Sequence, residues 1–373
     1  MIKVLSIFGT RPEATKMAPL MLVLKDCPKI DCKIAVTAQH RSQLDQVLNI
    51  FRITPDYDLD IMRQRQTLAD VTSRTLTGIE DIIKKENPDL VLVHGDTSTT
   101  MASALAAYYC QKSVGHVEAG LRTYDKYQPF PEEINRRLTS AIADLNFAPT
   151  ENAKNNLIKE NISAHTIYVT GNTAIDCLRY TIRPDYTFSE PVLNNLDFSK
   201  RILVMTAHRR ENLGRPLTNI CNAVKRLVND FEDIVLVYPV HLNPAVRETV
   251  FPLLSGRPRI ILTDPVDPQD LHNLMSRSYM VLTDSGGLQE EVPSMGKPVL
   301  VLRNVTERPE AITAGTAELA GVEEDEIYSA ASAYLSDSEK YNRMARAKNP
   351  FGDGRASERI RDAILKYYDL TVG

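Results

Sequence analysis

Short apolar runs alternate with longer amphipathic stretches along almost the whole chain. This alternation is typical of βα units, in which helices connect the parallel strands of a sheet. The strands expected in the first half are residues 3–8, 33–37, 90–93, 114–117, 145–148 and 166–169. Residues 14–24 and 68–85 are expected helices between them. The pattern predicts an α/β fold built on largely parallel, doubly wound sheets.

The alternation breaks at residues 182–200, where prolines, asparagines and isolated apolar residues indicate a linker. It restarts with expected strands at 202–206, 234–238, 259–262, 280–283 and 298–302. A chain of 373 residues favours two domains. We expect two Rossmann-like domains facing each other across a cleft, with ligands at the carboxyl ends of the strands. Their expected bounds are 1–170 plus 355–373, which includes a returning tail helix, and 171–354.

The composition excludes several classes of partner. The formal net charge is −4 and no cluster of Lys and Arg is present, which disfavours nucleic acid. No apolar stretch approaches the ~20 residues that cross a bilayer. The N-terminal apolar run is too short for a signal peptide and is typical of a first strand. We therefore expect a cytoplasmic protein without a membrane partner.

The motifs of metal and dinucleotide sites are missing from the sequence. The five cysteines are scattered without CxxC spacing, as is typical of reduced thiols. The HxxH and HExxH spacings are also absent, so no metal is expected. No GxGxxG occurs, which disfavours a Rossmann-type NAD site. The sequence thus predicts a protein that works without a metal or a cofactor.

Acidic residues follow successive expected strands of the first half. Asp96 and Glu118 come just after strand ends, and Glu132 begins the next helical stretch. Each has an ordinary alternative, since Asp96 can cap a helix and Glu132 and Glu133 can complement a helix dipole. Because the ends of parallel strands meet at one edge of a sheet, their convergence favours acid–base chemistry.

Basic residues follow other strands. Arg11 and Lys16, after the first glycine turn, can hold a diphosphate, although solvated side chains on an ordinary turn are an equal alternative. His208 follows the strand 202–206 as a possible proton carrier or diphosphate donor, and His241 follows the next strand. Each histidine alone is more often a satisfied structural residue. Arg308 is the best anion ligand of a later turn.

Residues 283–291 combine a strand end, a Ser-Gly-Gly turn and a short helix. The two glycines let the backbone approach a phosphate, and Ser285 adds a hydroxyl donor. The alternative is an ordinary βα turn capped by Asp284 or Ser285. Glu291 suits the hydroxyl pair of a ribose, and Glu290 is expected to be a solvated or capping neighbour. The pattern predicts a nucleotide-diphosphate site.

Eight ordered motifs lie along essentially the full chain. They are FGTRPEA (8–14), VHGD (93–96), GHVEAGLR (115–122), PEE (131–133), HRRE (208–211), TDSGGLQEE (283–291), TERPE (306–310) and NPFGDG (349–354). In these motifs the chain resembles the non-hydrolysing UDP-N-acetylglucosamine 2-epimerases. The resemblance implies a GT-B arrangement of two domains, a homodimer, and interconversion of UDP-N-acetylglucosamine and UDP-N-acetylmannosamine.

The resemblance also implies a mechanism. UDP leaves C1 as the C2 proton is lost, and the resulting 2-acetamidoglucal takes UDP back after protonation on the other face of C2. It implies that Asp96 and Glu132 handle the protons and that Glu118 and His208 support the sugar and diphosphate. The positions that match UDP ligands of the family are Arg11, Lys16, Ser285, Gly286, Gly287, Glu291 and Arg308. Leu271 stands where some relatives place a phenylalanine against uracil, which implies apolar contact.

A second, activating UDP-N-acetylglucosamine site is implied as well. The residues that match it are Gln39, Arg65, Glu132, Arg209 and His241, while Ser42 replaces a glutamine of some members. The family resemblance further implies a role in supplying N-acetylmannosamine units for surface polysaccharide.

Three other functions are compatible with these residues. A GT-B glycosyltransferase would need an acceptor surface, and no basic amphipathic membrane face is evident. A hydrolysing relative would release the free sugar and UDP. A non-catalytic UDP-sugar sensor would be expected to lose one of the carboxylates, yet Asp96, Glu118 and Glu132 are all present.

Overall fold

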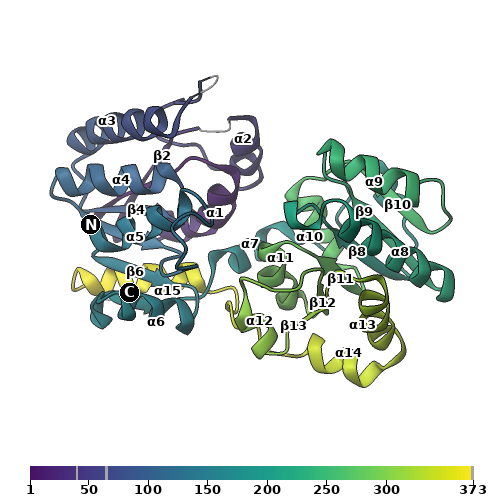
Figure 1. Cartoon of the computed structure of the whole chain (residues 1–373). Helices are drawn as coiled ribbons and strands as arrows, with labels where there is room; N and C mark the ends of the chain where they lie inside the picture. Colours follow the sequence, from purple (N-terminus) through teal and green to yellow (C-terminus); the bar gives the residue numbers. More distant parts are fainter. Residues whose placement is uncertain (39–40, 64–65, 371–373) are drawn as a thin grey trace. The chain divides into compact units, whose positions relative to one another are not determined.

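The chain folds into two compact units, one formed by Met1–Tyr180 with Phe351–Gly373 and the other by Thr181–Pro350. The structure is a computed structural model that describes residues 1–38, 41–63 and 66–370, without the side chains of residues 41–43. In Figure 1 the first unit runs from purple to teal and includes the yellow C-terminal helix, and the second unit is mainly green. Each unit contains one parallel β-sheet covered by helices.

The first sheet has the strand order β3-β2-β1-β4-β5-β6-β7, with every neighbouring pair parallel. Its strands are β1 (Ile2–Phe8), β2 (Ile30–Val36), β3 (Tyr57–Asp58), β4 (Leu90–His94), β5 (Ser113–Val117), β6 (Leu145–Ala148) and β7 (Ile167–Val169). The chain winds outward from β1 in one direction and from β4 in the other. The switch point, where ligands of such sheets bind, therefore lies between β1 and β4.

The second sheet repeats this arrangement with the order β10-β9-β8-β11-β12-β13, again all parallel. Its strands are β8 (Arg201–Thr206), β9 (Ile234–Pro239), β10 (Ile260–Thr263), β11 (Met280–Thr283), β12 (Val299–Val301) and β13 (Ala317–Leu319). Here the switch point lies between β8 and β11. The expected α/β class and the two doubly wound sheets are confirmed.

Helices follow nearly every strand. In the first unit they are α1 (Arg11–Lys25), α2 (Arg41–Ile50), α3 (Leu68–Glu86), α4 (Ser98–Tyr109), α5 (Glu132–Ile142), α6 (Glu151–Lys159), α7 (Thr173–Thr181, which ends at the boundary) and α15 (Ala356–Tyr367). In the second unit they are α8 (Arg215–Asp230), α9 (Pro244–Leu254), α10 (Pro268–Ser276), α11 (Gly286–Glu291), α12 (Pro309–Thr313), α13 (Glu324–Ser336) and α14 (Ser338–Ala345). Short 3-10 turns are η1 (Ala164–Thr166), η2 (Pro191–Asn195), η3 (Arg210–Asn212) and η4 (Val292–Met295). Across the described stretches, no helix has the length and apolarity needed to cross a membrane.

The expected return of the C-terminal helix to the first unit is confirmed. Ile360 and Ile364 of α15 are fully buried in the same apolar core as Leu24 and Phe147. Asp176 of α7 accepts the backbone N–H groups at the start of α15, from Ala356 at 3.1 Å and Ser357 at 2.7 Å. Figure 1 shows α15 lying among the helices and strands of the first unit. A capped helix and a shared core thus attach the tail to the first sheet.

Candidate active site

A buried carboxylate joins the two loops at the switch point of the first sheet. Glu13 of α1 is 3% exposed, and its Oε2 accepts the backbone N–H groups of Gly9 and Thr10 at 3.0 and 2.8 Å. Its Oε1 accepts the hydroxyls of Thr97 and Thr100 at 2.8 and 3.1 Å. Burial is the main cause that raises the pKa of Glu13, and these hydrogen bonds oppose it. Glu13 therefore holds the loop after β1 against the loop after β4.

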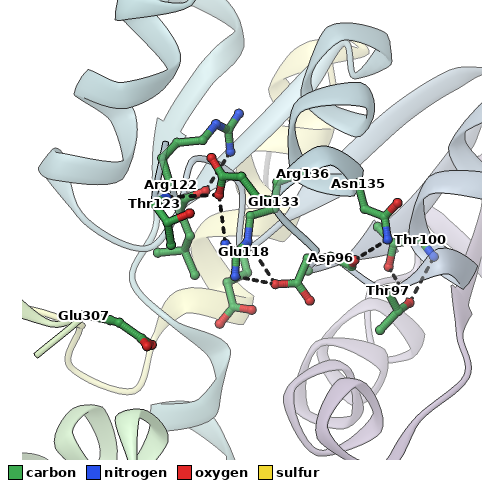
Figure 2. A network of polar contacts seen from close by, with 12 residues as sticks. Asp96, Thr97, Thr100, Glu118, Arg122, Thr123, Glu133, Asn135, Arg136 and Glu307 are labelled. Carbon is green, nitrogen blue, oxygen red and sulfur yellow. Dashed lines mark hydrogen bonds and ion pairs between the residues drawn. The ribbon is translucent and has the colours of Figure 1, made fainter. Parts of the chain in front are cut away.

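Asp96 lies in the loop after β4 and is paired with a cation. Arg136 of α5 donates to Asp96 Oδ2 from Nε at 2.9 Å and from Nη2 at 2.7 Å. The same guanidinium lies 3.2 Å from Glu133, as Figure 2 shows. The helix cap of α4 is Thr97, which accepts from the Thr100 N–H at 3.1 Å. The capping alternative for Asp96 is therefore wrong, because its carboxylate pairs with Arg136.

Glu118 follows β5 in a left-handed backbone conformation with φ of +64°. A non-glycine residue in this region is strained, and such strain concentrates at functional sites. Its Oε1 accepts from Asn172 Nδ2 at 3.0 Å and from the Lys16 ammonium, and its Oε2 lies 3.7 Å from His94 Nε2. Lys16 thus lies beside Glu118, the carboxylate that the family resemblance implies as a support of the sugar.

Two histidines in this region are held in the neutral form. Burial lowers the pKa of His94 to about 3 and that of His116 to about 4. His116 Nε2 donates to the carbonyl of Gly95 at 2.7 Å, which supports the loop that carries Asp96. A neutral imidazole can direct a hydrogen bond here without adding positive charge beside Lys16 and Arg136.

Glu132 and Glu133 begin the same helix but have different surroundings. Glu133 is buried and accepts the backbone N–H groups of Thr123 and Tyr124 at 3.0 and 3.1 Å, so it is structural. Glu132 Oε2 is buried without a hydrogen-bond partner among the described residues. An unsatisfied carboxylate oxygen is costly and is a candidate for contact with a ligand.

The other residues of the first unit that were predicted to bind the substrate or the activator have few described contacts. Arg11 is the first residue of α1 and is partly exposed. Gln39 and Arg65 lie outside the described residues. Ser42 lies within α2, and its side chain is likewise outside the described part of the chain.

A second buried carboxylate joins the switch-point loops of the other sheet. Asp284 follows β11 and is fully buried. Its Oδ2 accepts the backbone N–H groups of His208 and Arg209 at 2.7 and 2.8 Å, and Nδ2 of Asn212 at 3.0 Å. Asp284 is therefore neither a cap of α11 nor a solvated residue, but the support of the loop after β8.

The structure brings together two histidines that were assigned to different sites. The rings of His208 and His241 stack with centroids 5.1 Å apart and an interplanar angle of 8°. His208 Nδ1 lies 3.4 Å from Asp284 Oδ1. Burial is the main cause that lowers the pKa of His208, and Asp284 opposes it. The catalytic candidate and the activating-site candidate thus form one surface of the second unit.

Two arginines flank the glycine turn. Ser285 precedes α11, and Gly286 and Gly287 are its first residues. A Cβ built on Gly286 would lie 3.7 Å from the guanidinium groups of both Arg209 and Arg308. Neither glycine has a positive φ, so what glycine provides is space beside the cations and not an unusual backbone. Cations beside the N-terminal N–H groups of a helix form an environment suited to an anion.

The acidic residues around this turn pair with arginines. Glu290 is 2% exposed and pairs with the Nε of Arg308, so its expected role as a solvated or capping neighbour is wrong. Glu307 lies 3.7 Å from Arg209, 3.6 Å from Arg303 and 4.0 Å from Arg308. These two carboxylates orient the guanidinium groups beside the turn.

The residues expected at the nucleoside lie on neighbouring elements. Glu291, the last residue of α11, has an oxygen 3.4 Å from Nε2 of His272 on α10. Leu271 precedes that histidine and is partly buried. The hydroxyl of Thr181 and Nδ1 of His272 form a hydrogen bond of 2.8 Å, which fixes the ring beside Glu291.

Glu13 and Asp284 are the residues that the sequence reasoning missed as parts of the site. For Glu13 a local signal existed, because Thr10-x-x-Glu13 is a capping box and the structure contains it. A capping box does not reveal that Oε1 reaches a loop 84 residues away. For Asp284 the partners are likewise distant in sequence, at 76 and 75 residues.

Comparison with known proteins agrees with the motifs. The family model described as UDP-N-acetylglucosamine 2-epimerase matches residues 23–365. The UDP-N-acetylglucosamine 2-epimerase of Bacillus subtilis is 56% identical over 367 residues, covering 98% of this chain and 96% of that protein. The enzyme of Escherichia coli K12 is 49% identical over 370 residues, covering 97% and 98%.

Solved structures are similar over the same length. The Neisseria meningitidis UDP-GlcNAc 2-epimerase bound to UDP-GlcNAc matches with a TM-score of 0.88 and 46% identity, covering 98% of this chain and 100% of that one. The S. aureus MnaA–UDP structure matches with a TM-score of 0.86 and 49% identity, covering 100% of both chains. With this agreement of motifs, fold and full-length similarity, the chain belongs to the UDP-N-acetylglucosamine 2-epimerase family.

Proposed function

We propose that this protein is an isomerase that interconverts UDP-N-acetylglucosamine and UDP-N-acetylmannosamine without hydrolysing them. The observation that carries the proposal is that this family member has Asp96 and Glu118 directly after the paired strands β4 and β5, and Glu132 at the start of the helix whose Arg136 pairs with Asp96. The family relationship supplies the substrate, and the carboxylates supply groups that can move a proton. The Glu132 oxygen that is buried without a partner among the described residues supports a contact with the ligand at this site.

We propose elimination and re-addition of UDP as the route. The C2 hydrogen of an acetamido sugar is not acidified by a carbonyl, so direct proton abstraction is difficult. Loss of UDP from C1 with loss of the C2 proton gives a 2-acetamidoglucal, and re-addition follows protonation of the other face. Of Asp96 and Glu132, one would remove the C2 proton and the other would deliver a proton to the opposite face of C2. Glu118 with Lys16 would orient the sugar.

The second unit would hold the leaving group. Ser285, Gly286 and Gly287 offer backbone and hydroxyl donors, and Arg209 and Arg308 lie beside them. Such donors stabilise the negative charge that develops on the departing diphosphate. Glu291 would bind the ribose hydroxyls and Leu271 would contact uracil.

Incubation with UDP-N-acetylglucosamine alone in D2O tests the proposal. We expect the epimeric UDP-sugar with deuterium at C2. Free N-acetylmannosamine with UDP would instead indicate hydrolysis, and no reaction until an acceptor is added would indicate a glycosyltransferase. An epimer without deuterium at C2 would contradict the elimination route.

Amide replacements of the carboxylates test their roles. Asp96→Asn and Glu132→Gln should each lower kcat by about 10²-fold or more, the usual contribution of a general acid or base. UDP affinity should change little, because the diphosphate contacts are assigned to other residues. Calorimetric titration with UDP supplies this control. Activity that survives either change would refute the assignment of the proton pair.

We also propose the wider properties that the resemblance implies. These are a cytoplasmic homodimer, supply of N-acetylmannosamine units for surface polysaccharide, and activation by UDP-N-acetylglucosamine through Gln39, Ser42, Arg65, Glu132, Arg209 and His241. The stacking of His241 on His208 supports an activator that acts beside the catalytic residues. A reverse reaction that starts without added UDP-N-acetylglucosamine, together with non-sigmoidal rates, would argue against activation.

A further inference from the structure

A carboxylate and an imidazole face each other at the switch point of the second sheet. Asp284 Oδ1 lies 3.4 Å from His208 Nδ1. Asp284 is fully buried, and within the described residues its Oδ1 has no hydrogen-bond partner. A buried carboxylate oxygen without a donor is costly. The ring nitrogen of His208 is placed to supply that donor after a small movement.

The two oxygens of Asp284 have separate tasks. Oδ2 accepts from the backbone N–H groups of His208 and Arg209 and from the Asn212 side chain, at 2.7, 2.8 and 3.0 Å. The carboxylate that faces the ring of His208 therefore also holds the backbone of His208. Because one carboxylate contacts both the backbone and the ring of His208, the ring stays close to Asp284 Oδ1.

We propose that Asp284 is a positioning residue that fixes the Nδ1–H tautomer of His208 and enables the ring to take up a proton when a diphosphate binds. The inference rests on the proposed function, which supplies the diphosphate. With Nδ1–H directed at Asp284, Nε2 lies on the opposite side of the ring. Nε2 takes a proton from solvent and donates it in a hydrogen bond to the ligand, while Asp284 balances the charge of the imidazolium.

The charges around His208 explain why the proton would arrive only with the ligand. Among the described residues, the titratable groups that act on the ring are Asp284, His241 and Arg209. Burial, His241 and Arg209 lower the pKa of His208, and only Asp284 raises it. The free protein therefore keeps the ring neutral above its ordinary pKa near 6.5. A bound diphosphate adds negative charge and raises the pKa of His208, so binding draws in a proton.

Calorimetric titration of UDP into the unmodified protein tests this coupling. At about pH 7.5, in buffers of different ionisation enthalpy, binding should take up a measurable fraction of a proton. His208→Gln should lose that uptake, and the difference between the two proteins removes protons exchanged by UDP or by other groups. UDP binding without any difference in proton uptake would overturn the inference.

Asp284→Asn separates positioning from loop structure. Its carboxamide oxygen can replace Oδ2 and keep the three loop hydrogen bonds, while its NH2 faces His208 Nδ1 and forces that nitrogen to accept. We expect UDP affinity to fall about tenfold to 100-fold, as for loss of a hydrogen bond between charged groups, and proton uptake to disappear. In a His208→Gln background the same change should have little further effect. Independent losses in the double variant would contradict the dyad.

The tautomer gives a readout that needs no ligand. In ¹⁵N spectra of histidine-labelled protein, His208 should carry its proton on Nδ1 in the native chain and on Nε2 in Asp284→Asn. The Nε2–H tautomer in the native chain would refute the role of Asp284. If UDP does not bind the native protein, the proposed function fails, and this spectrum still tests the dyad.

Discussion

At the scale of single residues, buried carboxylates organise the site without being exposed to a ligand. Glu13 and Asp284 both lie at the switch point of their sheet, Glu13 after β1, which neighbours β4, and Asp284 after β11, which neighbours β8. Each accepts backbone N–H groups from one loop. Glu13 reaches hydroxyls of the other loop, and Asp284 itself belongs to the other loop. Two loops that carry candidate site residues are thereby held together in each unit.

Substitution of Glu13 should reveal this role. Glu13→Ala removes the acceptor of the buried Gly9 N–H and the half-buried Thr10 N–H and cuts the link to the Thr97 and Thr100 hydroxyls, so we expect a loss of at least about 2 kcal/mol in the free energy of unfolding. Glu13→Gln can accept the backbone N–H groups with its oxygen and donate to the hydroxyls with its NH2, so it should retain most stability. Urea unfolding of both variants checks this. Equal losses in the two would show that the negative charge matters more than the bonding pattern.

At the scale of elements, the turn into α11 is defined by the space that its glycines leave. The strand β11 ends at Thr283, and the hydroxyl of Thr283 accepts the N–H of Ser285 at 3.0 Å. Arg209 from the loop after β8 and Arg308 from the loop before α12 lie beside Gly286. Arginines from two other loops thus lie beside the start of α11.

Gly286→Ala tests whether that space binds the diphosphate. The new methyl group would lie 3.7 Å from both guanidinium groups, an ordinary contact, and Ala is favoured over Gly in a helix, so stability should be unchanged or slightly higher. We expect UDP affinity to fall about tenfold, equal to about 1.4 kcal/mol. Calorimetric titration measures the affinity, with thermal unfolding as the control. An unchanged Kd would place the diphosphate elsewhere.

At the scale of the molecule, the chain crosses between its two units twice, so the first unit includes residues from both ends of the sequence. The second crossing brings α15 into the core of the first unit, where Ile360 and Ile364 are fully buried. Asp176 at the start of this helix is part of the same attachment. The stability of the first sheet therefore depends on α15.

Ile364→Ala should destabilise the first unit selectively. Removal of a buried isoleucine side chain costs about 2–5 kcal/mol, so hydrogen exchange should increase in peptides of the first sheet. The matched control is Leu227→Ala in α8, which is fully buried in the core of the second unit and should accelerate exchange there. Equal acceleration of both units by either change would mean that they unfold as one cooperative body.

Much of the fold follows from local pattern. The apolar runs at 145–148 and 280–283 are β6 and β11 with the same bounds, because a buried parallel strand needs a short continuous apolar segment. The strands β3 (Tyr57–Asp58) and β13 (Ala317–Leu319) were not predicted. Both are short edge strands that include polar residues, and their pairing with a neighbour, not their own composition, makes them strands.

The sequence was sufficient to identify the family and the residues that follow each strand, since both depend on local motifs and on their order. It did not reveal side-chain partners. Glu132 and Glu133 are adjacent and chemically identical, yet Glu133 is bound to backbone N–H groups and Glu132 has the unsatisfied oxygen. Lys16 meets Glu118, and Asp284 meets His208, across 102 and 76 residues. Such pairs are created when the strand order places β1, β4 and β5 side by side and β8 beside β11, and this long-range arrangement exists only in the folded chain.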